Sequence, residues 1–152
     1  MDNTLTRKNG IVGYDILHEQ MKQVSETLKS GDFQQIFVIG GGCDGDVPVI
    51  ANLNRKHNGD LTVIWLDAHG DLNSPSESET GLFYGMPARV LMGDCSVFQD
   101  IIEIPLSPTK LIHIGGRDFD RPEIHYLEQN EYAPCGQRDA FIQSIVDLLT
   151  KE

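Results

Sequence analysis

The chain has 152 residues, a formal net charge of -11 and 39% hydrophobic residues, as expected for one globular domain over residues 1–152. The negative charge argues against nucleic acid or an anionic membrane as a partner, because both bind basic surfaces. No apolar run approaches the ~20 residues of a membrane span, and the N-terminus lacks a signal-peptide apolar region, so we expect a cytoplasmic protein. The three cysteines form no CxxC pair and should be free thiols.

The first third of the chain predicts an arm, a helix, a strand and a second helix. Residues 1–13 are mostly polar, and we expect a flexible arm there. Apolar residues recur every three or four positions over residues 14–30, which predicts an amphipathic helix. The short apolar run at residues 36–39 predicts a buried strand, and residues 48–56 predict the next helix.

The loop between that strand and helix reads Gly-Gly-Gly-Cys-Asp-Gly-Asp over residues 40–46. Its glycine spacing fits the GxGxxG pattern of dinucleotide-binding domains, which is one interpretation. Asp44 and Asp46 count against it, because they would repel a pyrophosphate at the helix N-terminus. Alternatively, the loop brings Cys43 to a metal ion as a thiolate ligand, or Cys43 is a small buried apolar residue.

The most informative stretch is a predicted buried strand, residues 63–66, that ends in Asp67-Ala-His69-Gly-Asp71. If the backbone stays near-extended, alternate residues project to one side, so Asp67, His69 and Asp71 can converge. Two carboxylates at such a short separation repel each other unless a cation or protons neutralise them. The pattern therefore predicts a divalent metal site, and its imidazole favours Mn²⁺, Zn²⁺ or Fe²⁺ over Ca²⁺ or Mg²⁺.

The second half of the chain continues the alternation of helices and strands. Residues 76–81 form a polar loop of the kind that carries substrate contacts. We expect helices at residues 87–92, 122–129 and 139–149 and a third buried strand at residues 111–114. Strands separated by helices indicate an α/β fold in which a short, mainly parallel sheet lies between helical layers, a three-layer sandwich.

Several motifs resemble those of the ureohydrolases, the family of arginase, agmatinase and formiminoglutamase. They are Asp-Ala-His-Gly-Asp-Leu-Asn-Ser-Pro at residues 67–75, Gly-Met-Pro at residues 85–87 and Gly-Gly-Arg-Asp at residues 115–118. The resemblance covers roughly residues 36–134. It implies an arginase-like fold and a binuclear Mn²⁺ site that activates water for attack on a guanidinium or amidine carbon.

The resemblance also implies metal roles for individual residues. Asp67, His69 and Asp71 match ligands of the family, and Cys43 stands where the family has a histidine ligand. No further Asp-x-Asp segment of the kind that completes the family's metal sites follows Asp118. One ion would keep three of these ligands and the other only two, so we expect at most one firmly bound Mn²⁺, with Zn²⁺ possible.

Four other residues match positions that contact substrate or move protons in the family. Asn73 and Thr80 correspond to substrate contacts, and Glu131 to a glutamate that meets the guanidinium group. Tyr84 stands where the family has a proton-shuttling histidine. A phenol is a poor substitute because it normally titrates near 10.

Three functional interpretations follow. The leading one is a truncated, arginase-family, metal-dependent hydrolase of C–N bonds in small linear amidines or guanidines, with an incomplete metal site and weak or no activity in this chain alone. The second is a non-catalytic, arginase-like remnant or interaction module. It would form a homo-oligomer or be completed by another chain, because a short sheet leaves edges uncovered. The third is a Rossmann-like nucleotide-binding domain.

Overall fold

The computed structural model describes residues 5–130. None of the helices in this range combines the length and apolarity needed to cross a bilayer. The helices and strands, in chain order, are β1 (Arg7–Lys8), β2 (Ile11–Val12), α1 (Tyr14–Ser30), α2 (Val47–Lys56), β3 (Val63–Leu66), α3 (Pro87–Leu91), β4 (Leu111–Ile114) and α4 (Arg121–Gln129). Short 3-10 turns lie at Cys43–Asp46, Phe83–Gly85 and Pro108–Lys110.

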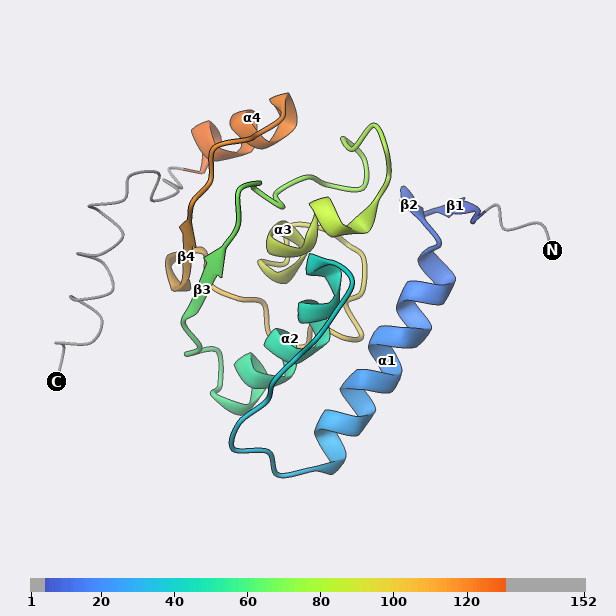
Figure 1. Ribbon diagram of the computed structural model, residues 1–152, viewed down its shortest axis with the longest axis vertical. Helices are drawn as coiled ribbons and strands as arrows, with labels where there is room; N and C mark the ends of the chain where they lie inside the picture. The colour runs from blue at the N-terminus through green and yellow to red at the C-terminus, as the bar shows by residue number, and fades with distance from the viewer. Residues whose placement is uncertain (1–4, 131–152) are drawn as a thin grey trace, which may run out of the picture.

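A parallel pair of strands, β3 and β4, lies at one side of the described chain, with Val63 opposite Leu111 (Figure 1). Side chains alternate across the pair, so Val63 and Trp65 are buried while Ile64 and Leu66 are 44% and 68% exposed. A short parallel sheet whose strands are connected through a helix, α3, confirms the expected α/β class. In the described part of the chain, helices cover the sheet face that carries Trp65.

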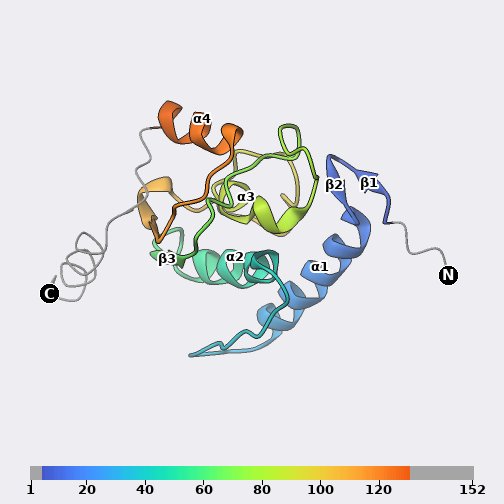
Figure 2. The same cartoon turned by 45° about the horizontal axis from the view of Figure 1, so that its top comes forward.

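The helical layer is built from α1, α2 and α3. Each helix contributes buried side chains to the same core as Val63 and Trp65, among them Met21, Ala51 and Val90. Figures 1 and 2 both show α2 between β3 and α1, with α4 beyond the end of the sheet. The loop after α3 completes this core, because Phe98 is only 1% exposed and stacks on Tyr14 with ring centroids 4.9 Å apart.

The strand predicted at residues 36–39 is absent, and that expectation was wrong. These residues run as irregular chain, and Phe37 and Ile39 are 90% and 88% exposed. A strand needs a neighbour for its backbone N–H and C=O groups. Within residues 5–130, however, β3 pairs only with β4. The helix after the glycine loop forms as α2, but the strand that opens a dinucleotide fingerprint is missing, which removes the structural basis for the nucleotide-binding interpretation.

The expected flexible arm also differs from the structure over residues 5–13. Strands β1 and β2 pair as a small antiparallel hairpin, and Ile11 is fully buried. The Arg7 guanidinium donates a 2.7 Å hydrogen bond to the Ser78 carbonyl, which ties this hairpin to the polar loop. The helix predicted at residues 139–149 lies outside the described residues.

Candidate metal centre and cleft

Three potential metal ligands converge where β3 ends. Asp67 follows the last residue of β3, and Cys43 begins the 3-10 turn before α2. The Cys43 thiol donates to Asp67 Oδ2 over 3.4 Å. One ligand atom each from Cys43, Asp67 and Asp71 lies within 4.8 Å of the others. The sequence-based expectation placed Cys43 here only as one alternative, and the structure brings it to the cluster.

His69 does not join that group, so the expected convergence of Asp67, His69 and Asp71 on one point is only partly realised. The chain bends at Ala68, and Asp67 Oδ1 accepts a 2.8 Å hydrogen bond from the His69 backbone N–H. The imidazole, which is 64% exposed, instead lies with Nδ1 3.2 Å from Asp67 Oδ1 and Nε2 3.8 Å from Asp118 Oδ2. The extended geometry assumed from the sequence fails because the backbone turns here.

Asp71 is the most deeply buried member of the cluster. It is 3% exposed, and its backbone has φ 54°, in the left-handed region that few non-glycine residues adopt. Burial, together with the nearby charge of Asp67, raises the pKa of Asp71 to about 6. Its Oδ2 atom is buried and has no hydrogen-bond partner among the described residues. A buried carboxylate oxygen without a partner is costly, so this atom calls for a cation or a proton.

The same burial and neighbouring charges also shift the pKa values of Cys43 and Asp67. Burial, followed by the negative field of Asp71, raises the pKa of the Cys43 thiol to about 12. Burial also works to raise the pKa of Asp67, but hydrogen bonds from His69 and Cys43 outweigh it and hold that pKa below its usual range. One thiol and two carboxylates at these separations fit a single divalent cation.

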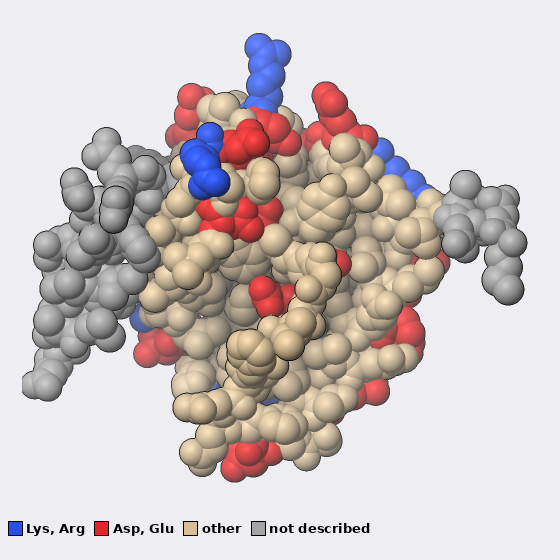
Figure 3. Space-filling view, viewed as in Figure 1, with Lys and Arg blue, Asp and Glu red and all other residues tan. Residues whose placement is uncertain are grey.

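The cluster opens into a cleft of about 850 Å³. Several acidic side chains line it, including Glu77, Asp118, Asp120 and Glu123, with Arg121 as the basic residue in its lining. Figure 3 shows acidic side chains gathered on this face, with basic side chains beside them. The cleft therefore favours a positively charged ligand.

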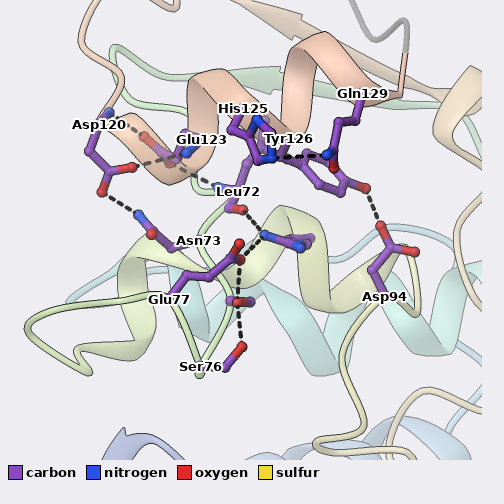
Figure 4. Close-up of polar contacts among 12 residues, drawn as sticks. Leu72, Asn73, Ser76, Glu77, Asp94, Asp120, Glu123, His125, Tyr126 and Gln129 are labelled. Carbon is purple, nitrogen blue, oxygen red and sulfur yellow. Dashed lines mark hydrogen bonds and ion pairs between the residues drawn. The ribbon is translucent and has the colours of Figure 1, made fainter.

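Asn73 stands in the cleft wall, held by an interaction that the sequence did not reveal. Its Nδ2 atom donates a 2.6 Å hydrogen bond to Asp120 Oδ2 (Figure 4). Asp120 also caps α4, accepting from the Glu123 backbone N–H at 3.1 Å. Asp118, Asp120 and Glu123 were missed as site residues. The sequence does carry a signal for Asp118 and Asp120, because both lie in the loop after β4, the strand that pairs with β3.

The remaining expected site residues occupy the outer part of the cleft. Thr80 and Tyr84 both line it, and Tyr84 is 54% exposed. The Thr80 hydroxyl accepts a 3.3 Å hydrogen bond from the Leu82 backbone N–H. Glu131 lies outside the described residues.

This arrangement defines a class of protein: an α/β domain with carboxylates gathered at the carboxyl ends of parallel strands, where such folds place their sites. The family comparison is more specific. The model of the "Arginase family" matches residues 4–150, and the chain belongs to that family.

Relatives and solved structures agree with that assignment. The chain is 32% identical over 132 residues to an arginase of Staphylococcus aureus, covering 82% of this chain and 42% of the relative. It is 35% identical over 112 residues to Arginase-1 of Sus scrofa, covering 68% of this chain and 33% of that protein. The chain thus spans less than half the length of these relatives.

Two solved structures share the fold. Arginase from Bacillus subtilis superimposes with a TM-score of 0.70 at 25% identity, covering 86% of this chain and 46% of that one. Entamoeba histolytica arginase, in complex with L-ornithine, superimposes with a TM-score of 0.79 over 93% of this chain and 51% of that one. At 21% identity, this second likeness concerns the fold alone. Together they confirm the arginase-like fold expected from the sequence.

Proposed function

We propose that this chain is a metal-dependent, arginase-family hydrolase of C–N bonds in linear amidines or guanidines. The observation that carries the proposal is the position of the cluster, because Cys43 and Asp71 line the acidic cleft. A divalent ion held by Cys43, Asp67 and Asp71 would supply Lewis-acid activation of water. The resemblance implies Mn²⁺ as this ion, with Zn²⁺ as the alternative.

The charge of the cleft supports a cationic substrate. Amidines and guanidines are positively charged near neutral pH, and carboxylates from several elements face the space they would occupy. The arginase of Entamoeba histolytica, which shares the fold, was solved with L-ornithine, a cationic amino acid. Asn73 Oδ1 is buried without a partner among the described residues and could accept a hydrogen bond from an amidinium N–H.

Other residues have proposed supporting roles. Thr80 contributes a hydroxyl to the cleft wall, and Tyr84 is positioned to exchange protons between substrate and solvent. Glu131 is proposed as a substrate contact on the resemblance alone. His69 is proposed as a further ligand, although it now pairs with Asp67 and Asp118. With three donors in one group, we propose at most one firmly bound ion and weak hydrolysis by this chain alone.

The metal site is tested by calorimetric titration of divalent ions into metal-free protein. Wild type should take up about one ion per chain, and Asp67→Ala should lose that uptake. Absence of uptake by folded wild-type protein would refute the proposal.

Activity is tested by offering arginine, agmatine and formiminoglutamate to metal-loaded protein and measuring urea or formamide release. We expect wild-type protein to release urea or formamide slowly, and we expect Asp71→Asn to abolish this release. Turnover near ~10 s⁻¹, typical of an enzyme, would contradict the weak activity proposed for this chain, and no release with any of them would contradict hydrolysis.

A non-catalytic interaction module is the second candidate, favoured by exposed apolar side chains. Ile64 and Leu66 are exposed on one face of the sheet, and Phe37 and Ile39 are exposed in the segment before Cys43. Parallel sheets are normally covered on both faces, so association with a second copy or another chain would bury this surface. Light scattering tests this candidate: a monomer at high concentration would refute self-association.

A further inference from the structure

Cys43 changes the chemical character of the candidate metal centre. A thiolate is a soft ligand that favours Zn²⁺, whereas Mn²⁺ prefers carboxylate, carbonyl and water oxygens. The arginase resemblance implies Mn²⁺ with a histidine at this position. The donor set of Cys43, Asp67 and Asp71 therefore fits a divalent ion but does not fit Mn²⁺ as its preferred occupant.

The geometry of the cluster agrees with zinc coordination. A tetrahedral Zn²⁺ with Zn–S of about 2.3 Å and Zn–O of about 2.1 Å places its sulfur and oxygen ligands about 3.6 Å apart. Cys43 Sγ and Asp67 Oδ2 are 3.4 Å apart. The two atoms can therefore bind one ion after only a small adjustment, in which the thiol hydrogen bond gives way to two metal–ligand bonds.

A second observation points to a ligand at the cluster. Asp71 is 3% exposed, and its Oδ2 atom is buried without a hydrogen-bond partner in the described range. Asp71 also contributes a ligand atom to the group within 4.8 Å. A buried carboxylate of this kind is satisfied by an ion placed between it and the other two donors.

We infer that Cys43, Asp67 and Asp71 form a site that selects Zn²⁺ over Mn²⁺, with Cys43 bound as the thiolate. On binding, the S–H bond is replaced by a Zn–S bond and the proton passes to solvent. The inference rests on the metal site of the proposed function and changes the identity of its ion. Three protein ligands would leave one tetrahedral position for water or substrate, and two of the three, Cys43 and Asp71, line the cleft.

The decisive quantity is the ratio of Zn²⁺ to Mn²⁺ affinity, measured by competition with a chelating indicator. Zn²⁺ binds most oxygen and nitrogen sites more tightly than Mn²⁺, so a high ratio in wild type alone proves nothing. The test is how much Cys43→Ser changes the ratio. Cys43→Ser should lower the ratio by about tenfold or more, because it replaces a soft donor by a hard one. Cys95→Ala and Cys135→Ser are the matched controls and should leave the ratio unchanged.

Cobalt gives a readout that is independent of activity. Co²⁺ bound to a thiolate has a near-ultraviolet charge-transfer band, which is expected in wild type and both control variants and should vanish in Cys43→Ser. Circular dichroism checks that Cys43→Ser remains folded, and Asp67→Asn, which keeps the thiol, should weaken the band.

The outcomes separate this inference from the proposed function. An unchanged affinity ratio or cobalt band in Cys43→Ser would overturn the inference while metal uptake still supports the proposed hydrolase. If wild type binds neither Zn²⁺ nor Mn²⁺, both fail. A band lost in Cys95→Ala or Cys135→Ser instead would place the thiolate elsewhere and overturn the inference.

Discussion

Glu123 of α4 accepts a hydrogen bond from the Leu72 backbone N–H, 51 residues earlier in the chain, at 3.0 Å. Its other carboxylate oxygen accepts from the Asp120 N–H, also at 3.0 Å. Glu123 is only 4% exposed, so few water molecules can replace it. A Cβ atom on Gly70 would lie 2.8 Å from Glu123 Oε1, and that position therefore has no room for a side chain. One carboxylate thus joins α4 to the loop that carries the metal cluster.

Replacing Glu123 by alanine should destabilise the fold by about 2–4 kcal/mol, because two N–H donors lose their acceptor. The free energy of unfolding from urea denaturation gives the value. Glu128→Ala, an exposed glutamate on the same helix, should change it by less than about 0.5 kcal/mol. Equal losses for the two variants would show that the Glu123 hydrogen bonds contribute little.

The Tyr126 hydroxyl donates to the Asp94 carboxylate (Figure 4). The Tyr126 ring lies against Arg89, whose guanidinium carbon is 4.3 Å from the ring centroid. Tyr126→Phe keeps the ring and removes only the hydrogen bond. We expect a loss of about 1 kcal/mol in unfolding free energy, since Asp94 is exposed and water can replace the donor. Tyr84→Phe, at a 54% exposed position, is the comparison and should be neutral.

Glu77 should contribute a small acid-sensitive part of the stability. A 2.5 Å hydrogen bond from Ser74, aided by the 2.6 Å ion pair with Arg89, lowers the pKa of Glu77 below its usual 4.5. A lowered folded-state pKa gives stability that is fully present above pH 4.5 and is lost as the pH falls through the folded-state value. The contribution should be under about 1 kcal/mol because the carboxylate is partly exposed.

The Glu77→Gln variant separates this contribution from that of the other carboxylates. The stability difference between wild type and Glu77→Gln should be constant above pH 4.5 and shrink below it. Urea denaturation across this range measures it, with Glu79→Gln in the same exposed loop as the control. A difference that grows on acidification would contradict the assigned direction.

The spacing of apolar residues along the sequence predicted one long helix and two strands correctly. The helix expected at residues 14–30 forms as α1, and the strands at residues 63–66 and 111–114 form as β3 and β4. Residues 36–39 have the same apolar character as those strands but remain exposed. Apolar composition shows that a segment can be buried, whereas pairing requires a neighbouring backbone that sequence periodicity does not identify.

The candidate site was predictable where its residues are close in sequence. Asp67 and Asp71 lie four residues apart, so their convergence could be expected from one motif. The position of Cys43 beside Asp67 depends on how the loop before α2 meets the end of β3, which left its role open. The contact between Asn73 and Asp120 spans 47 residues and depends on the parallel pairing of β3 with β4. Contacts between residues so far apart in sequence depend on which strands pair, and the sequence motifs did not predict this contact.

Asp71 should cost stability when no metal is bound, because its carboxylate is buried close to that of Asp67. Asp71→Asn removes this repulsion, and asparagine tolerates the left-handed backbone at φ 54°. We expect metal-free Asp71→Asn to be about 1–2 kcal/mol more stable than wild type near neutral pH. Added Zn²⁺ should then raise the melting temperature of wild type but have little effect on the variant. Asp32→Asn, at a 99% exposed side chain, controls for loss of one negative charge. A metal-free Asp71→Asn protein less stable than wild type would show that the carboxylate supports the fold.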